Sequence, residues 1–218
     1  MTRLMPSHLS RWLWIGVAAQ LAPSSSQGQK PGQPYVSPLK NFSITVPNYA
    51  FGTKVQKSNK GDGGFVVFIG GFGDLERIEY VRVDSAAIAA QDSATRLLLY
   101  EGVLDNVVTA NHAQVLAAEP LSGPGETQLY ALVQFPEASQ VVDGKTGKRM
   151  DSFRGVLVLT RGAFLYMLYV EAGGLFGAGE PGEKQVARGK DAVQRLLGEI
   201  SFQGSPIPVV RDTARAPE

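Results

Sequence analysis

The stretch Ala163–Glu171 constrains the fold more than any other part of the sequence, because it is apolar on both faces of an extended strand. One face would carry Phe164, Tyr166, Leu168 and Val170, and the other Leu165, Met167 and Tyr169. Successive side chains of a strand point to opposite faces, and an antiparallel strand with one wet face alternates apolar with polar residues. Thr127–Phe135 and Phe65–Ile69 also lack this alternation. The pattern therefore predicts a sheet that is covered on both sides.

Two segments with helical periodicity are available as covers. The first runs from Thr95 to near Asn111, with Asp92 or Ser93 as its N-cap. The second runs from about Pro181 to Gly198, with Pro181 in its first turn. We therefore expect an α+β fold, an antiparallel sheet covered by helices on both faces (an α/β/α sandwich).

The remaining strands are short and are separated by turns that are rich in glycine and proline. Predicted strands are Phe42–Val46, Thr53–Ser58, Phe65–Ile69, Glu76–Val83, Ala113–Ala118, Thr127–Phe135, Arg154–Thr160 and Ala163–Glu171. Predicted turns are Asn59–Gly64, Gly70–Gly73, Glu119–Gly125 and the hairpin connection Arg161-Gly162. The alanine-rich Ser85–Ala90 either extends the first helix or forms a separate turn.

The N-terminus has the pattern of a secretory signal peptide. Arg3 and Arg11 precede an apolar run, Trp12–Ala22, that is shorter than the roughly 20 residues of a typical transmembrane helix. We expect a signal peptide over residues 1–22, with cleavage after Ala19, and the alternative is an uncleaved membrane anchor. Residues 23–38 are rich in serine, glycine, glutamine and proline and are predicted to be a flexible linker. One domain, 39–202, and a disordered tail, 203–218, complete the expected organisation.

The order of the elements resembles the PsbP-like α/β/α sandwich superfamily. The resemblance is carried by three segments: Phe42–Pro47, the hairpin Gly155–Tyr169 and the closing residues Leu196–Phe202. It implies a fold shared by an extrinsic photosystem II protein, a Ran-binding import factor and many exported bacterial proteins. It also implies a binding or assembly role without catalysis, and no binding residue is transferred from it.

Composition and motifs argue against several kinds of chemistry. The chain has no cysteine, which excludes disulfides and thiolate ligands, and its net charge of +1 does not fit a nucleic-acid binder. His112 is the one histidine outside the signal peptide, and we expect it to be a polar helix end. Gly144-Lys145-Thr146 lacks the glycine that a phosphate-binding loop needs five positions earlier, because that position is Ser139. It is predicted to be a hairpin tip, and no cofactor or metal is expected.

Carboxylate pairs are the remaining candidates for acid–base chemistry. Glu76 with Glu79 and Asp62 with Asp74 are the nearest pairs in sequence, and all four are expected in or beside solvated turns.

Two segments are candidate partner-binding sites. Leu175 and Phe176 lie among four glycines, and they either bind a partner or pack back onto the core. Lys145, Lys148 and Arg149 form a basic cluster that suits an acidic protein or membrane headgroups, or is a solvated hairpin. The favoured function is an exported, non-enzymatic binding or assembly module that engages another envelope protein. The alternatives are a carrier of a small apolar ligand and an enzyme of unrecognised mechanism.

Overall fold

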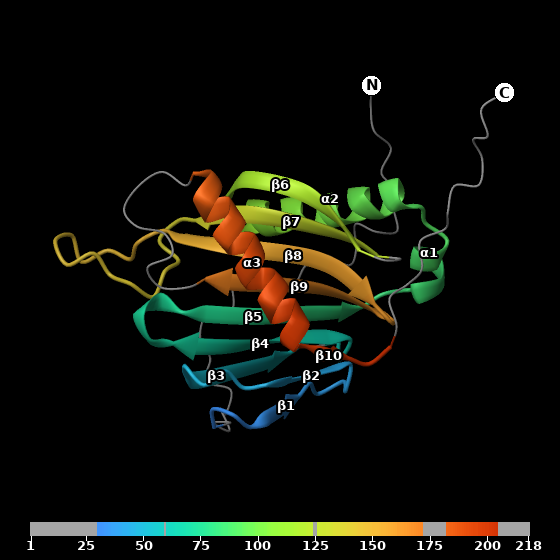
Figure 1. The fold of residues 1–218 in the computed structure, drawn as a ribbon, viewed down its shortest axis with the longest axis horizontal. Helices are drawn as coiled ribbons and strands as arrows, with labels where there is room; N and C mark the ends of the chain where they lie inside the picture. Colours follow the sequence, from blue (N-terminus) through green and yellow to red (C-terminus); the bar gives the residue numbers. More distant parts are fainter. Residues whose placement is uncertain (1–29, 59, 124–125, 172–181, 205–218) are drawn as a thin grey trace.

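The computed structural model describes residues 30–58, 60–123, 126–171 and 182–204. The predicted signal peptide, the first part of the linker (residues 23–29), the Leu175-Phe176 segment and most of the tail lie outside these ranges. In chain order the elements are β1 (Pro34–Val36), β2 (Phe42–Thr45), β3 (Ala50–Lys57), β4 (Gly63–Gly70), the 3-10 turn η1 (Gly71–Gly73), β5 (Leu75–Arg82), α1 (Ser85–Ala89), α2 (Ser93–Ala110), β6 (Gln114–Gly123), β7 (Glu126–Phe135), β8 (Ser152–Arg161), β9 (Phe164–Glu171), α3 (Glu183–Glu199) and β10 (Ser201–Phe202) (Figure 1).

Seven of the strands form one antiparallel sheet in the order β3-β4-β5-β9-β8-β7-β6. It consists of two meanders, β3–β5 and β6–β9, that meet where β5 pairs with β9. A second, three-stranded antiparallel sheet has the order β1-β2-β10. The α+β class and the antiparallel sheet predicted from the sequence are confirmed.

Strand β9 is buried along its entire length, as its sequence predicted. Its alternate residues belong to two different clusters of buried side chains. Tyr166 and Leu168 pack in a cluster that includes Val193 and Leu196 of α3. Met167 and Tyr169 belong to the cluster that contains the buried apolar residues of α2, and one of these is Tyr100. Each fully buried side chain of this size contributes about 1.5–3 kcal/mol, so β9 is a main source of stability.

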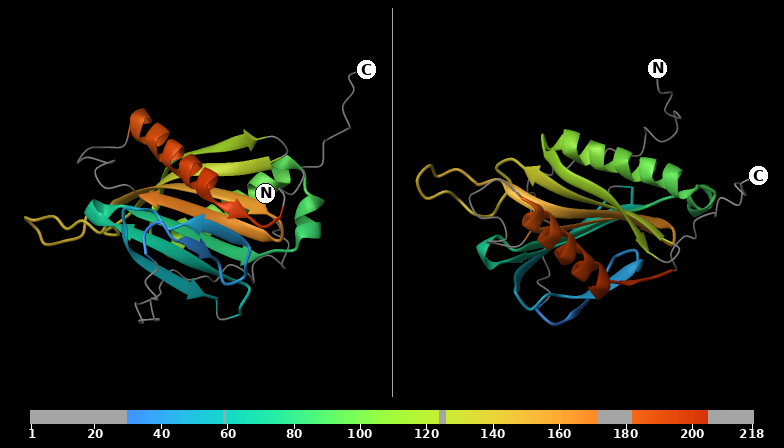
Figure 2. Two further views of the ribbon diagram at one scale, coloured as in Figure 1. Left: turned by 60° about the horizontal axis from the view of Figure 1, so that its bottom comes forward. Right: turned by 45° about the horizontal axis from the view of Figure 1, so that its top comes forward.

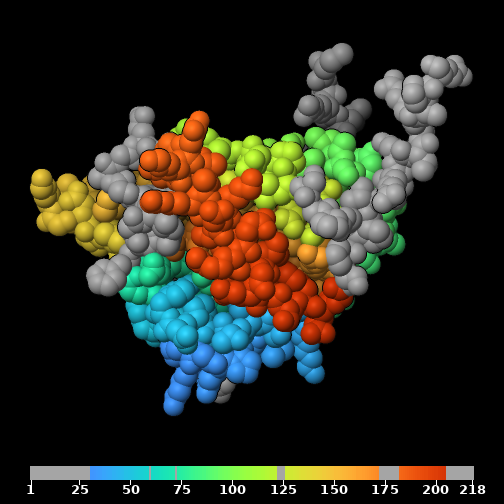
Figure 3. Space-filling model, in the orientation of Figure 1, coloured from blue at the N-terminus to red at the C-terminus, as the bar shows by residue number. Residues whose placement is uncertain are grey.

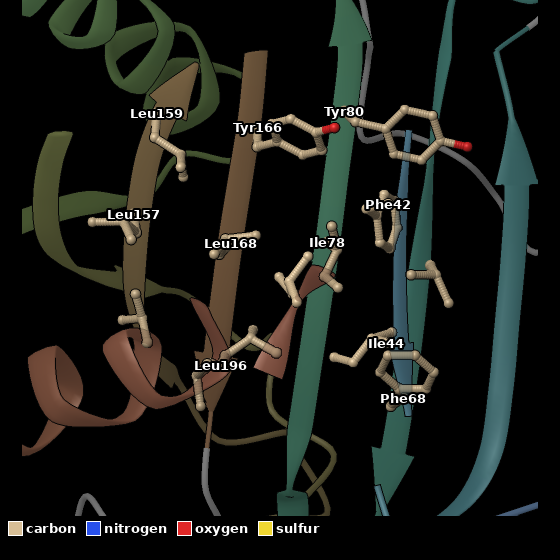
Figure 4. Packing of buried hydrophobic residues seen from close by; sticks show 14 of the residues in the cluster. Phe42, Ile44, Phe68, Ile78, Tyr80, Leu157, Leu159, Tyr166, Leu168 and Leu196 are labelled. Carbon is tan, nitrogen blue, oxygen red and sulfur yellow. The ribbon is translucent and has the colours of Figure 1, made fainter. Parts of the chain in front are cut away.

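The three-stranded sheet covers part of the large sheet, a role that the sequence assigned to the helices alone. Phe42 and Ile44 of β2 pack beside Phe68, Ile78 and Tyr80 of β4 and β5 (Figure 4). Phe42 lies 5.5 Å from Tyr80 and 6.1 Å from Tyr166, measured between ring centroids in edge-on contacts. The expected two-helix cover is therefore incomplete as a description of the core.

Strand β1 corrects the predicted boundary of the linker. Tyr35 lies within the segment expected to be flexible, yet it is 3% exposed and packs against the rings of Phe42 and Phe68. The segment around Tyr35 is also paired with β2, and the Val46 N–H donates a hydrogen bond of 2.8 Å to the Gln33 oxygen. The folded domain begins before Leu39.

A close approach between two glycines lets α3 lie against β8. A Cβ atom on Gly155 would come within 2.6 Å of the carbonyl oxygen of Gly189. Beside them the Tyr130 hydroxyl donates a hydrogen bond of 2.8 Å to the carbonyl oxygen of Val186. Backbone contact at this point allows Val193 and Leu196 to reach the core.

Helix α2 begins as the sequence predicted. The Asp92 side chain is the N-cap and accepts a hydrogen bond of 2.7 Å from the Thr95 N–H. The alanine-rich segment forms a separate short helix, α1, which is capped by Asp84. The buried Arg96 guanidinium joins the two helices, because it donates a bond of 3.0 Å to the Ile88 carbonyl oxygen.

Strand β6 differs from its prediction, because it continues through Glu119 and Pro120, which were expected to form a turn. Proline is tolerated here because β6 is the last strand of the sheet, and its outer edge has no pairing to lose. Among the described residues, no helix is both long enough and apolar enough to span a membrane.

Candidate functional site: a projecting arm and the charged cluster at its base

The most exposed structure of the described chain is the connection between β7 and β8. Residues 136–151, which we call the arm, leave the sheet after Phe135 and return at Ser152, and these two residues are register partners. The arm extends away from the body at one end of the sheet (Figures 1, 2 and 3). It is therefore presented to solvent by a rigid scaffold, where recognition elements are commonly found.

The two strands of the arm are joined by backbone hydrogen bonds. The Met150 N–H donates to the Val141 oxygen over 3.0 Å, and the Asp143 N–H donates to the Lys148 oxygen over 2.8 Å. At the tip, the Asp143 carboxylate accepts the N–H groups of Lys145 and Thr146, which lowers the pKa of this carboxyl group. The predicted hairpin tip at Gly144-Lys145-Thr146 is confirmed.

The base of the arm is tied to the sheet by side chains. The Asp151 carboxylate accepts hydrogen bonds from the Glu137 N–H (3.0 Å) and from the Gln134 amide (2.6 Å). The Arg154 guanidinium donates a bond of 3.1 Å to the Ala138 oxygen, and Ser139 is buried. These contacts fix the direction in which the arm leaves the sheet.

Arg154 is also part of a cluster of buried charged groups. Its Nε donates a hydrogen bond of 2.7 Å to the Ser152 hydroxyl and lies 3.4 Å from Oε2 of Glu171. The Ser152 hydroxyl donates to the same carboxylate oxygen over 2.6 Å. The Arg154 guanidinium lies over the Phe135 ring, 4.8 Å from its centroid. Burial lowers the pKa of Arg154, and the nearby Glu171 carboxylate opposes that shift.

A second ion pair lies on β5, the strand on the other side of β9. Arg77 pairs with Glu79, and its guanidinium lies 4.2 Å from the centroid of the Phe65 ring. The Tyr169 hydroxyl faces Glu79 at 3.5 Å. Burial, together with the Glu79 charge, raises the pKa of Tyr169 well above its ordinary value. We call Arg77, Glu79, Ser152, Arg154, Tyr169 and Glu171 the basal cluster.

A small cavity opens at the basal cluster, beside the end of α2. Its lining residues are Arg77, Glu79, Val107, Asn111, Phe135, Arg154 and Tyr169. Its volume is about 20 Å³, which is close to what one water molecule requires. Since the two arginines each have a carboxylate partner, the basal cluster is electrically balanced and has no room for an organic substrate.

The distal half of the arm carries a different set of side chains. Val141, Val142 and Met150 are 38%, 52% and 39% exposed. Lys145, Lys148 and Arg149, the basic cluster predicted from the sequence, are all exposed on the same segment. The structure thus places these cations beside apolar side chains that the sequence analysis had not assigned to the site.

The other candidates from the sequence are not assembled into a site. Leu175 and Phe176 lie outside the described residues. His112 is exposed and follows the C-cap Asn111 of α2 with a φ of 50°, as expected for a polar residue after a helix end.

The expected carboxylate pairs are corrected by the structure. Glu76 and Glu79 are 5% and 3% exposed, not solvated. They lie on opposite faces of the sheet, because they are three residues apart in one strand. Asp62 and Asp74 lie at opposite ends of β4. Neither pair is positioned to share a proton or a substrate.

Within the described part of the chain, no group of three histidine, aspartate or glutamate side chains is placed to hold a metal ion.

The basal cluster was missed by the sequence analysis because its members come from three separate strands, β5, β8 and β9. One local feature of the sequence pointed to it: two polar residues stand two positions apart in or beside a predicted strand. Examples are Arg77 with Glu79 and Ser152 with Arg154. At that spacing both side chains share a face, so a charged pair among buried neighbours indicates a buried network.

No family model matches the chain, and no curated protein matches it. Among solved structures, it is similar to cyanobacterial PsbP (CyanoP) from Synechocystis sp. PCC 6803, with 11% identity and a TM-score of 0.46, over 84% of this chain and 99% of that chain. It is also similar to the Ran-binding protein Mog1p of Saccharomyces cerevisiae, with 8% identity and a TM-score of 0.43, over 80% and 96% of the two chains. A protein from Bacteroides thetaiotaomicron VPI-5482 matches at 11% identity and a TM-score of 0.41 over 79% of this chain and 48% of that one, so this chain spans about half its length. Cyanobacterial PsbP, the kind of protein that the sequence resembles, is thus among the solved structures to which this chain is similar.

Proposed function

We propose that this protein is an exported, non-enzymatic binding or assembly module that engages another envelope protein through the arm. The observation that carries the proposal is the pairing of a rigid base with an exposed, apolar and cationic distal half. Chain segments that only connect two strands are usually short and polar, whereas this one is long and internally bonded.

The basal cluster supports a structural role for the buried charges. Its arginines and carboxylates are matched, and the cavity beside them has room for about one water molecule. A substrate pocket or an apolar carrier cavity measures some hundreds of Å³, on the order of 300 or more. The basal cluster therefore fits the anchoring of the arm better than catalysis or ligand transport.

The layering of the fold is part of this proposal. In it, α2 and α3 are the outer layers of an α/β/α sandwich. Each helix packs in a cluster that also contains every other residue of β9. The arm then extends from one end of the middle layer, where neither helix covers it.

The proposal is tested by placing a photo-crosslinking amino acid at Val142 in the cells that produce the protein. A matched control position is Leu98, which is 58% exposed on α2, away from the arm. We expect a protein to be trapped from Val142 and not from Leu98. Once identified and purified, that protein should bind the wild type in solution.

A shortened variant, in which Val141–Met150 is replaced by Asn-Gly, should lose the binding and keep its thermal unfolding midpoint. Failure to trap a protein from Val142, or equal binding of the purified partner by the shortened variant, would contradict the proposal.

A further inference from the structure

Within the described residues, the backbone of the arm leaves hydrogen-bonding groups free at its edges. Val142 and Arg149 form an antiparallel bridge, and the hydrogen bonds of the ribbon lie on either side of it. They are Met150 N–H to Val141 oxygen and Asp143 N–H to Lys148 oxygen. In such a non-hydrogen-bonded pair, the N–H and C=O groups of both residues point outward. The outer edges at Val142 and Arg149 are thus able to pair with a further strand.

The side chains of the arm leave both faces of the ribbon partly apolar. Val141 and Met150 share one face, because they oppose each other across the ribbon, and Val142 lies on the other face. An isolated two-stranded ribbon is marginally stable in water, and a third strand would bury these residues further. The strand that carries Val141 and Val142 has the stronger β-propensity of the two, because valine is β-branched.

The exposed charges of the distal arm indicate which charge its partner carries. Lys145, Lys148 and Arg149 are exposed, and the one acidic residue among them, Asp143, uses its carboxylate to bind backbone N–H groups. The cations are therefore the charges available to a partner, and they favour a segment that contains glutamate or aspartate.

We propose that the Val142 edge of the arm accepts an extended, acidic segment of a partner protein as an added strand. The inference rests on the proposed function and specifies the chemistry of the partner. A protein partner is favoured over a membrane surface, because the outward N–H and C=O groups would have no hydrogen-bond partner in the hydrocarbon of a bilayer. A strand from a protein pairs with them directly.

The probe is a synthetic peptide of about eight residues that alternates valine and glutamate, which is within the usual length of a strand. A peptide of the same length that alternates valine and lysine is its control. Binding is measured from the amide NMR shifts of the full chain after removal of residues 1–22. We expect the acidic peptide to shift the amide signals of Val142 and its neighbours, and the lysine peptide to leave them unchanged.

Val142→Pro is the decisive variant, because it removes an outward N–H that takes no part in the ribbon's own hydrogen bonds. It should weaken binding of the acidic peptide about tenfold or more, the equivalent of one lost hydrogen bond to a buried partner group. Val142→Thr keeps both the N–H and the β-branch, and it should bind nearly as well as the wild type.

Charge reversal gives an independent readout. The triple variant Lys145→Glu, Lys148→Glu and Arg149→Glu should abolish binding of the acidic peptide and create binding of the lysine peptide. The same reversal at Lys40, Lys57 and Lys184, which are exposed on other elements, should change little. Raising the salt from about 0.15 M to about 0.5 M should weaken the wild-type interaction, because salt screens exposed charges.

Vesicles with and without anionic lipid complete the experiment. Binding of the arm to anionic vesicles in place of the acidic peptide would overturn the inference, and so would equal peptide binding by Val142→Pro and Val142→Thr. Trapping of a protein from Val142 in cells, without any effect of Val142→Pro on the purified pair, would leave the proposed function intact and refute the added strand. Absence of a trapped protein would refute the proposed function itself.

Discussion

Glu76 is a buried carboxyl group, although burial destabilises its ionised form. It is 5% exposed on β5, and Tyr49 together with Arg195 and Glu199 of α3 lie close enough to influence its charge. Burial is the largest cause that raises the pKa of Glu76, and the Glu199 charge raises it further. The residue therefore links the stability of the domain to pH.

We expect Glu76→Gln to flatten the pH dependence of unfolding. When a carboxyl pKa is higher in the folded than in the unfolded state, the unfolded chain releases its proton first as the pH rises. The wild type should therefore lose stability from the unfolded pKa, about 4.3, up through the folded pKa. The glutamine cannot ionise, so the variant should be more stable than the wild type at neutral pH, with about 1.4 kcal/mol for each unit by which the pKa is raised.

The measurement is chemical denaturation at a series of pH values, and Glu101→Gln on the exposed side of α2 is the control. Parallel pH profiles for the wild type and Glu76→Gln would show that Glu76 does not carry this dependence.

Arg154 couples the basal cluster to the arm, and Arg154→Met should affect both. The variant leaves the buried Glu171 carboxylate without its cation, which costs about 3 kcal/mol or more in such sites. It also removes the bond to the Ala138 oxygen, so amide hydrogen exchange in the arm should become faster. Lys190→Met breaks the exposed ion pair with Glu119 and should cost less than about 1 kcal/mol. Equal losses for the two variants would refute the coupling.

For single residues, the sequence predicted correctly those roles that depend only on neighbouring residues in the chain. Asp92 as an N-cap and His112 as a polar helix end follow from local chemistry alone. The basal cluster does not, since Arg77 meets Tyr169 only after β5 has paired with β9.

Among the elements, the contact between α3 and β8 depends on the absence of a side chain. Gly155→Ala would push a methyl group into the backbone of Gly189, and backbone cannot move aside as a flexible side chain does. We expect a loss of about 1–3 kcal/mol in the free energy of unfolding, as for other overpacked sites. The measurement is equilibrium denaturation in urea.

Gly102→Ala is the matched control for this prediction. Gly102 lies in the interior of α2, and a Cβ atom added there would meet nothing within 4 Å, so alanine should stabilise the helix by about 0.5–1 kcal/mol. If Gly155→Ala were as stable as Gly102→Ala, the two backbones would not be in the tight contact described.

The elements that could be predicted are those whose sequence has a clear hydrophobic pattern. The ends of β9, α2 and α3 were predicted to within two residues, because a two-sided apolar strand or an amphipathic helix is recognisable in one segment. β1 was missed because three residues show no periodicity, and both its pairing with β2 and the packing of Tyr35 involve residues elsewhere in the chain. The second half of β6 was missed because Pro120 indicates a turn until its place at the sheet edge is known.

For the whole molecule, the domain is expected to reach an exported compartment through its first residues. Deletion of residues 1–22 should leave the protein in the cytoplasm, because it removes both the positive start and the apolar run. Fractionation of the producing cells checks this, and fusion of an unrelated secretory signal to residue 23 should restore export. Normal export of the deleted form would refute the prediction.

The large sheet ends in strands that are poorly suited to pairing with another chain. β6 has a register shift between Val115 and Ala117 and contains Pro120, while β3 has a shift near its start and carries Lys54 and Lys57. Bulges, prolines and lysines are common protections of sheet edges. The body of the molecule is thus shielded from uncontrolled association.

The register pairing of Phe135 with Ser152 has a practical meaning for this protein. The two ends of the arm join the sheet at a single pair of register partners. We therefore expect the segment between them to be replaceable by other hairpins, as the binding loops of antibodies are. New specificities should be obtainable by transplanting other hairpins between these two residues, with the scaffold left as it is.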